Sequence, residues 1–152
     1  MLGADHPDTL RSAHNLAYAL RRLGVVQAAR DLDQDTLDRR RVLGADHPET
    51  LFSAGNLADG LYRLGEVQAA CDLEQDTLHG FRQVLGPDHR NTLISATSLA
   101  ADLRALGEVQ AARDLEQDTL DRRRRVLGAD HPDTLTTASN LALDLRILGE
   151  DE

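Results

Sequence analysis

The stretch "LGADHPDTL", residues 2–10, returns as "LGADHPETL" at 43–51 and as "LGADHPDTL" at 127–135. A looser copy, "LGPDHRNTL", lies at 85–93. Successive copies begin 41, 42 and 42 residues apart. A fixed period of about 20–50 residues indicates an array of repeated structural units. We therefore treat the chain, residues 1–152, as a single repeat domain with three repeats and a half repeat: 2–42, 43–84, 85–126 and 127–152.

The sequence of each repeat predicts two helices. Proline disfavours helical geometry in the residue before it, so we expect His6 to be the last non-helical residue and Pro7 the first helical one. Asp8 would then lie in the first turn, where the helix dipole favours a negative charge. Gly24 is expected to end this helix, and the second helix should run over about 25–41. The apolar positions at helical spacing are Leu10, Ala13, Leu16, Ala17, Leu20 and Leu23 in the first helix, and Val26, Ala29, Leu32 and Leu37 in the second.

The apolar stripes predict how the helices pack. Neither helix of a repeat could bury its stripe alone, but neighbouring helices stacked in an array could. The chain is 41% hydrophobic and only 3% aromatic, so its core must consist of Leu, Ala and Val. This composition favours helices over a sheet. We predict an all-α fold of seven antiparallel helices, with the Asp-His-Pro motif serving to start a helix in each repeat.

Charge and cysteine content limit the possible functions. The net charge is −9 and the isoelectric point is about 5.0, which makes nucleic acid and anionic membranes poor candidates for partners. Cys71 is the only cysteine, so an internal disulfide and a cysteine metal cage are excluded. No apolar run approaches the roughly 18 residues of a membrane span. The N-terminus lacks a secretory signal pattern, and we expect a cytoplasmic protein without a cofactor.

With the helices placed, the pattern resembles the tetratricopeptide repeat (TPR). The 42-residue period and the "LG..HP" linker are similar to the kinesin-light-chain-like subclass. The shared residues are Leu16, Ala17, Leu20, Gly24, Val26, Ala29 and Leu37 in the first repeat; Leu57, Ala58, Leu61, Gly65, Val67, Ala70 and Leu78 in the second; Leu99, Ala100, Leu103, Gly107, Val109, Ala112 and Leu120 in the third; and Leu141, Ala142, Leu145 and Gly149 in the half repeat.

The second helices depart from the family pattern. Where the family usually has an aromatic residue, this chain has Asp33, Glu74 and Glu116; where it usually has a small residue, the chain has Thr36, Thr77 and Thr119. These helices are unusually polar, so we expect looser or salt-bridged packing there.

The resemblance implies a right-handed α-solenoid of about 3.5 TPR-like repeats, whose first helices line a concave face. It implies a non-catalytic scaffold that binds a protein or peptide, within a larger regulatory protein of the kind found in bacteria. The alternative is a structural module that self-assembles into homo-oligomers through its exposed ends. The predicted concave-face residues are Arg11, His14, Asn15, Tyr18, Arg21, Arg22, Phe52, Asn56, Asp59, Tyr62, Arg63, Ser98, Arg104, Asn140 and Arg146.

Arginine and aromatic side chains are frequent on this predicted face, although the chain is acidic. Aromatic residues and arginine are enriched in interaction hot spots. Guanidinium groups also bind carboxylates bidentately. The sequence therefore predicts a ligand that is an extended peptide with acidic side chains or a free C-terminal carboxylate. The opposing interpretation is that these are ordinary exposed residues.

Three other patterns have simpler explanations than a functional site. Asp31, Asp33 and Asp35 imitate the start of a calcium loop, but the required Gly and terminal Glu are missing. The run at 122–125 is all Arg, at a helix end where positive charge is favoured. The linker histidines are a full repeat apart, too far to share a metal. No phosphate loop or nucleophile with a matched base occurs, so we predict no enzyme and no metal site.

Overall fold

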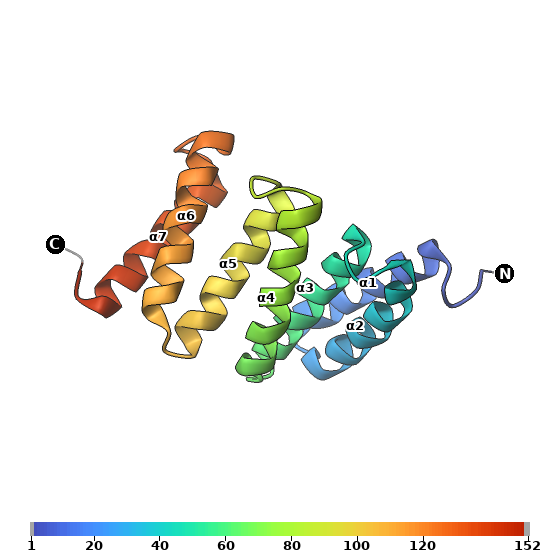
Figure 1. Ribbon diagram of the computed structural model, residues 1–152. Helices are drawn as coiled ribbons and strands as arrows, with labels where there is room; N and C mark the ends of the chain where they lie inside the picture. Colours follow the sequence, from blue (N-terminus) through green and yellow to red (C-terminus); the bar gives the residue numbers. More distant parts are fainter. Residues whose placement is uncertain (1, 151–152) are drawn as a thin grey trace. The chain divides into compact units, whose positions relative to one another are not determined.

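The computed structural model describes residues 2–150 and is built from helices (Figure 1). Within these residues there are seven α-helices, one short 3-10 helix and no strand. The elements are α1 (Pro7–Arg22), α2 (Val26–Arg40), the 3-10 helix η1 (Arg41–Leu43), α3 (Pro48–Arg63), α4 (Val67–Val84), α5 (Arg90–Ala105), α6 (Val109–Leu127) and α7 (Pro132–Leu148). The predicted all-α fold with seven helices is confirmed.

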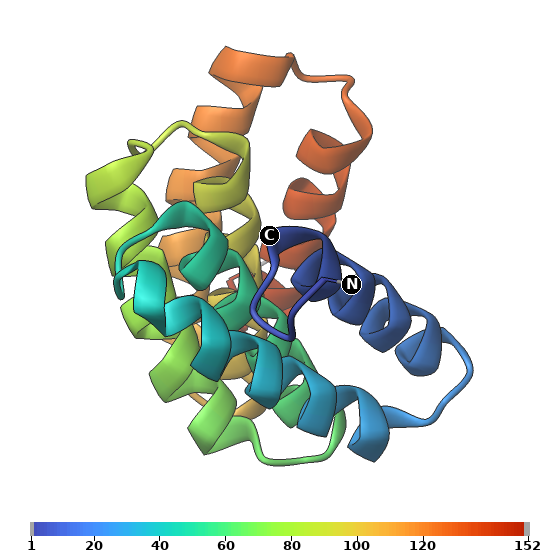
Figure 2. The same cartoon turned by 90° about the vertical axis from the view of Figure 1, so that its right-hand side faces the viewer.

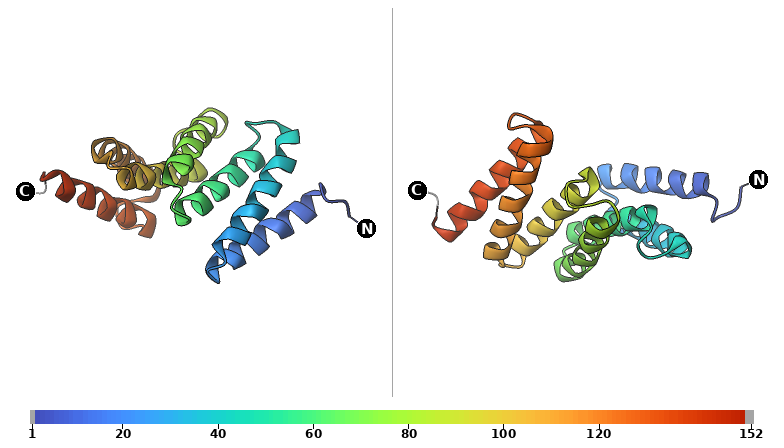
Figure 3. Two further views of the ribbon diagram at one scale, coloured as in Figure 1. Left: turned by 90° about the horizontal axis from the view of Figure 1, so that it is seen from below. Right: turned by 45° about the horizontal axis from the view of Figure 1, so that its top comes forward.

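The chain divides into two compact units, residues 1–80 and 81–152, which we call the N-terminal and C-terminal units. In the N-terminal unit, α2 packs against both α1 and α3. Figure 2 shows α1 and α2 running in opposite directions on either side of their short connection. In the C-terminal unit, α6 packs in the same way against α5 and α7 (Figure 3). Each unit therefore contains a second helix of a repeat between two first helices.

The linker histidines start the first helix of every repeat. His6 is the N-cap of α1, and its Nδ1 accepts a hydrogen bond of 3.1 Å from the backbone N–H of Asp8. The side chains of His47, His89 and His131 make the same bond, at 3.1–3.2 Å. A side-chain acceptor at this position satisfies one of the free N–H groups of the first turn. The predicted role of the Asp-His-Pro motif in helix initiation is confirmed.

Part of the predicted core stripe of α1 is exposed. Leu16, assigned to this stripe with Leu23, is 54% exposed, whereas Leu57 at the same repeat position on α3 is 4% exposed. Leu57 belongs to a core cluster with Leu37 of α2, because α2 precedes α3 and packs against it. Within the described chain, no second helix precedes α1 and covers Leu16. The expectation that Leu16 and Leu23 are buried was therefore wrong.

Candidate functional site

Most of the predicted concave-face residues lie on α1 and α3, and we call four of them, His14, Tyr18, Phe52 and Asn56, the α1–α3 cluster. His14 Nδ1 lies 2.9 Å from the Asn56 amide nitrogen. The His14 ring is also 5.0 Å from the Phe52 ring, at a tilt of 58°. Tyr18 and Phe52 remain exposed, while His14 and Asn56 are half-buried. The helices therefore present an aromatic and polar surface with two rings open to a ligand.

Burial lowers the pKa of His14 below its ordinary value of 6.5, and the nearby positive charges of Arg21 and Arg40 lower it further. A neutral imidazole can both donate and accept one hydrogen bond. The ring of His14 is therefore a polar contact point rather than a cation at neutral pH.

Exposed arginines flank the α1–α3 cluster. The Arg22 guanidinium carbon lies 6.0 Å from the centre of the Tyr18 ring, and its Nη1 donates to the Tyr18 hydroxyl at 3.4 Å. On α3, Arg63 Nε donates to Asp59 at 2.9 Å. Ion pairs at the surface are weak, because water competes for both partners. These two guanidinium groups could therefore exchange their contacts for a ligand carboxylate.

Arg21 and Arg104 contact carboxylates of other helices, whereas Arg22 and Arg63 contact residues of their own helix. Arg21 of α1 is buried and forms an ion pair with Asp33 of α2, and its Nε lies 3.6 Å from Asp59. Arg104 of α5 pairs with Asp144 of α7, and its Nη2 lies 3.7 Å from Glu116 of α6. Both side chains therefore join helices within their own unit.

Two acidic residues of the second helices, Asp33 and Glu116, are buried, and they are the residues that these arginines contact. Burial raises the pKa of Asp33, and the Arg21 charge opposes this shift. Burial also raises the pKa of Glu116 to about 7, against the attraction of Arg104. Thr36, Thr77 and Thr119 are buried as well, and their hydroxyls donate to the backbone carbonyls of Leu32, Leu73 and Leu115, four residues earlier. The salt-bridged packing expected for the second helices is confirmed for α2 and α6.

The remaining predicted site residues divide between the two units. In the N-terminal unit, Arg11, Asn15 and Tyr62 are exposed, and Arg11 pairs with Asp8 at 2.8 Å. In the C-terminal unit, Ser98 and Arg146 are exposed and Asn140 is half-buried. The side-chain contacts that join predicted residues of α1 to those of α3 are His14 with Phe52 and Asn56, and Arg21 with Asp59.

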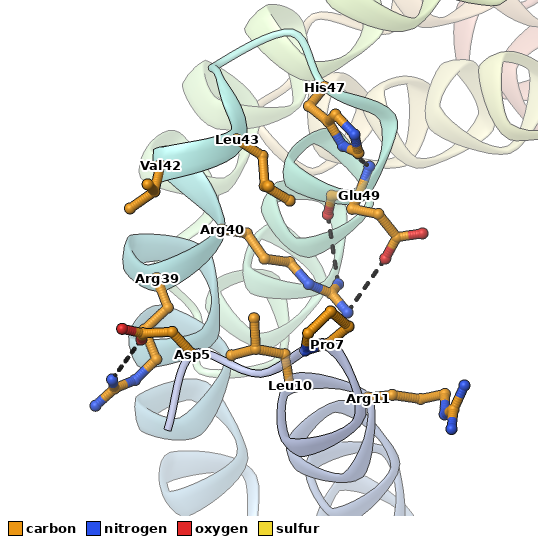
Figure 4. A pocket seen from close by; sticks show the side chains of 10 residues that line it. All are labelled: Asp5, Pro7, Leu10, Arg11, Arg39, Arg40, Val42, Leu43, His47 and Glu49. Carbon is orange, nitrogen blue, oxygen red and sulfur yellow. Dashed lines mark hydrogen bonds and ion pairs between the residues drawn. The ribbon is translucent and has the colours of Figure 1, made fainter. Parts of the chain in front are cut away.

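A second site, which the sequence analysis missed, lies where the first repeat meets the second. It is a cavity of about 530 Å³ in the N-terminal unit, with Pro7, Leu10, Val42 and Leu43 forming its apolar part (Figure 4). Its polar and charged side chains are Asp5, Arg11, Arg39, Arg40, His47 and Glu49. Arg40 is buried and donates to the Ser53 hydroxyl at 2.8 Å. The charges are largely paired within the chain, as in the 2.8 Å contact of Arg39 with Asp5.

An equivalent but smaller cavity of about 210 Å³ lies in the C-terminal unit, beside Arg123. The first repeat is one residue shorter than the third at this point. As a result α2 ends at Arg40 and a 3-10 turn follows, whereas α6 continues to Leu127. Val42 is 88% exposed but its counterpart Val126 only 50%. The sequence feature that could have indicated these cavities is the Val-Leu pair before the linker glycines at 44, 86 and 128.

The patterns that resembled other sites have structural roles. Asp31, Asp33 and Asp35 lie within α2. In the arginine run, Arg122 and Arg125 contact Asp88, the linker aspartate of the same repeat, at 2.9 and 3.0 Å. The hydrogen bond from Arg122 is the main cause that lowers the pKa of Asp88. The run therefore ties a helix end to a linker.

Neither a metal site nor a membrane span is found in the described chain. No group of three or more His, Cys, Asp or Glu side chains in residues 2–150 could hold a metal ion. None of the helices described is both long and apolar enough to cross a bilayer.

The arrangement of the helices defines a helical-repeat protein, and comparison with known proteins identifies the family. The tetratricopeptide repeat model matches residues 9–49, 50–91 and 92–133. The chain belongs to the tetratricopeptide repeat family. No curated protein matches it in sequence.

Solved structures that it resembles include kinesin-light-chain-like proteins. One is a kinesin light chain protein of Podosopora anserina with nearly identical TPR-like repeats: 30% identity, TM-score 0.89, covering 95% of this chain and 69% of that one. A single-substitution variant of it gives 28% identity and the same TM-score, covering 99% and 70%. BtubC (BKLC) from P. vanneervenii has 18% identity and a TM-score of 0.86, covering 96% and 59%, and shares the fold. The predicted family and subclass are confirmed, and this family is in general a non-catalytic scaffold for protein interactions.

Proposed function

We propose that this protein is a non-catalytic scaffold that binds an extended peptide across α1 and α3 of its N-terminal unit. The observation that carries the proposal is the α1–α3 cluster, in which exposed Tyr18 and Phe52 stand beside the His14–Asn56 contact. By resemblance to related bacterial arrays, we further propose that it works in the cytoplasm within a larger regulatory protein.

Each part of the cluster suits a different part of a peptide. Tyr18 and Phe52 offer apolar anchors, as aromatic side chains do at interaction hot spots. His14 and Asn56 can exchange their mutual hydrogen bond for bonds to a peptide backbone. Arg22 and Arg63 can bind acidic side chains or a C-terminal carboxylate. Such a small surface predicts an affinity of roughly micromolar, which weakens as salt screens the arginines.

Arg21 and Arg104 have a supporting role in this proposal. Their guanidinium groups already contact buried carboxylates of the second helices. Breaking a buried ion pair to bind a ligand would leave a carboxylate without its partner charge, which is costly. We assign ligand contact to the exposed arginines and helix positioning to these two.

The test is a peptide-array screen followed by binding measurements on variants. The double variant Arg63→Ala, Tyr62→Ala should lose most of its affinity for the selected peptides. It removes a guanidinium group that would bind a peptide carboxylate and a ring that would contact the peptide. His79→Ala, Arg82→Ala removes a ring and a guanidinium from exposed positions of α4 and should bind normally. Selected peptides without acidic character, or equal binding by both double variants, would remove this face from the account.

Self-assembly is the second candidate, favoured by the exposure of Leu16 on α1 and of Leu23 directly after it. Exposed apolar side chains on one helix can be covered by another copy. Light scattering at high concentration separates the two candidates. A monodisperse monomer supports the peptide scaffold, while a dimer or growing chain that Leu16→Glu abolishes supports self-assembly.

A further inference from the structure

Arg40 of α2 shows how a buried guanidinium group is held between two repeats. Its Nη1 donates to the Ser53 hydroxyl at 2.8 Å and to the backbone carbonyl of Glu49 at 3.4 Å. Its Nη2 lies 3.2 Å from the carboxylate of Glu49, in the first turn of α3 (Figure 4). Two neutral oxygens therefore hold one nitrogen of the group, and a carboxylate of the chain itself neutralises its charge.

Arg123 of α6 is held in the same way in the C-terminal unit. Its Nη1 donates to the Thr137 hydroxyl at 2.6 Å and to the backbone carbonyl of Asp133 at 3.0 Å. The side chain is 5% exposed, so the guanidinium group is as deeply placed as that of the first repeat. Its two partners stand at the repeat positions of Ser53 and Glu49. The arrangement therefore occurs independently in both units.

The carboxylate that completes the arrangement is missing at Arg123. Asp133 is one methylene shorter than Glu49, and no carboxylate among residues 2–150 lies within ion-pair distance of this arginine. Its Nε and Nη2 donate no hydrogen bond within the same part of the chain. Burial lowers the pKa of Arg123 from the ordinary value of 12.5, and the more distant charges of Asp133 and Glu116 oppose that shift. Because a buried charge is stabilised by a paired partner, Arg123 offers a position for a carboxylate that the chain does not supply.

This position opens on an apolar cavity. Arg123 lines the cavity of about 210 Å³ in the C-terminal unit, together with Leu93 of α5 and with Val126 and Leu127 of α6. The start of α7 completes the wall, so every helix that forms the cavity belongs to the described chain. Sites for drug-sized molecules measure about 300–1,000 Å³. This smaller cavity therefore suits a ligand of a few heavy atoms with an apolar part.

The charges around the cavity favour an anion over a cation. Asp88 lines the cavity but lies 2.9 Å from Arg122 and 3.0 Å from Arg125, which neutralise it. Arg90 lines it as well, is exposed and forms no ion pair among residues 2–150. Asp133 adds one negative charge against this arginine and the buried guanidinium group. A ligand carboxylate therefore meets an excess of positive charge.

We propose that this cavity binds a small monocarboxylate with a short apolar chain. The carboxylate of the ligand takes the position at Arg123 that Glu49 holds at Arg40. Nε and Nη2 of Arg123 donate two parallel hydrogen bonds to it, which is the strongest way for a guanidinium group to bind a carboxylate. The apolar chain of the ligand contacts Leu93 and Leu127. The site shares no residue with the α1–α3 cluster and is independent of the peptide proposed to bind there.

The test is a titration of the whole isotope-labelled protein with pentanoate, followed by the NMR shifts of backbone amides. We expect shifts at Val126, Leu127 and Thr137, with a dissociation constant of about one millimolar, because so small a ligand makes few contacts. Pentylamine has the same apolar chain but carries a positive charge, and it should leave these amides unchanged. Equal binding of the two compounds would overturn the proposal.

Substitution of Asp133 makes the test specific, since it keeps both hydrogen bonds of Arg123. Asp133→Glu restores the side-chain length of Glu49, so the new carboxylate should reach Arg123 and weaken pentanoate binding by at least about tenfold. Asp133→Asn removes a like charge and should strengthen binding by about threefold. Asp8→Glu is the matched control, because it lengthens a first-turn acid in the other unit. It should leave binding in the C-terminal unit unchanged.

The converse substitution should create a second site. Glu49→Asp shortens the acid that neutralises Arg40, so pentanoate should then also shift the amides of Val42 and Leu43. Circular dichroism should show unaltered folding of the variants, since none of the substituted residues belongs to the core.

Three further results would overturn the proposal. One is the absence of shifts in the unaltered protein at tens of millimolar pentanoate. Another is binding that Asp133→Glu leaves unchanged. The third is a set of shifts at the same amides caused by an acidic peptide but not by pentanoate, which would assign the cavity to a protein ligand.

Discussion

Arg21 and Arg104 stand at the same repeat position in the two units, but they meet differently placed acids. Each contacts one buried acid of the second helix, Asp33 or Glu116. Their second carboxylates differ: the Asp59 side chain near Arg21 is 45% exposed, whereas the Asp144 side chain paired with Arg104 is fully buried.

The consequence is electrostatic. In the N-terminal unit, water and Arg63 share the charge of Asp59. In the C-terminal unit, two buried acidic side chains, Glu116 and Asp144, lie near Arg104, and burial keeps the proton on Glu116 up to a pH of about 7. Nearly identical repeat sequences can therefore differ in their response to pH. The acid of the next helix lies one residue further along α7 than along α3, and this displacement decides whether its side chain reaches water.

The largest expected effect is from Arg104→Ala. It leaves the buried Asp144 carboxylate, and above pH 7 the Glu116 carboxylate as well, without their cation, and loss of one partner of a buried pair costs about 3–5 kcal/mol. Arg21→Ala should cost less, because Asp59 is open to water. Urea unfolding followed by circular dichroism measures both. Tyrosine fluorescence isolates the N-terminal unit, since both tyrosines, Tyr18 and Tyr62, lie there. Equal losses in the two variants would contradict this comparison.

The next prediction concerns pH. Glu116 has a pKa of about 7 in the folded protein against an ordinary value of 4.5. Between these values the folded chain holds a proton that the unfolded chain has lost, so stability falls as pH rises through this window, by up to about 3 kcal/mol. Glu116→Gln resembles the protonated form and should remove this fall. Exposed Glu66→Gln serves as the control and should retain it. Unfolding midpoints between pH 4 and 8 that change in parallel for both variants would refute the assignment.

The sequence predicted the local features of these units well. Helix starts at Pro7, Pro48 and Pro132 follow from proline chemistry, and α5 starts in the same way without proline because His89 caps it. Burial was predicted less well. Periodicity shows that Leu16 lies on an apolar stripe, but not whether another helix covers it.

Pairing across helices was harder to predict than helix position. The polar residues Asp33 and Glu116 were recognised as departures from the family pattern. Their arginine partners lie twelve residues earlier on a different helix. Arg21 was therefore interpreted as a surface residue from its spacing, although the structure buries it.

A smaller effect is expected from the linker histidines. His47→Ala removes the side-chain acceptor for the N–H of Glu49 and should cost about 1 kcal/mol, as loss of an N-cap does. Peptide binding should remain intact. His79→Ala is the control, since His79 is exposed within α4 and starts no helix. A large loss of binding at unchanged thermal stability would show that the linker has a direct role in recognition.

The smallest effect concerns the short first repeat. Insertion of one arginine after Arg41 restores the length found in the third repeat, so α2 should extend in place of η1. The change in stability should stay within about 0.5 kcal/mol, because the region is at the surface. Slower amide hydrogen exchange at Val42 and Leu43 would show the extended helix. Unchanged hydrogen exchange would mean that the missing residue of the first repeat does not cause the difference between the two cavities.

The most direct test of the peptide-scaffold proposal compares the two units at one position. Phe52 on α3 and Ile94 on α5 occupy the same repeat position and are 40% and 44% exposed. A selected peptide without tyrosine or tryptophan is titrated against the Phe52→Ala and Ile94→Ala proteins, with the tyrosine fluorescence of the N-terminal unit as the signal. Binding at the α1–α3 cluster predicts a loss of at least about tenfold for Phe52→Ala and less than about twofold for Ile94→Ala. Equal losses, or a larger loss for Ile94→Ala, would contradict it.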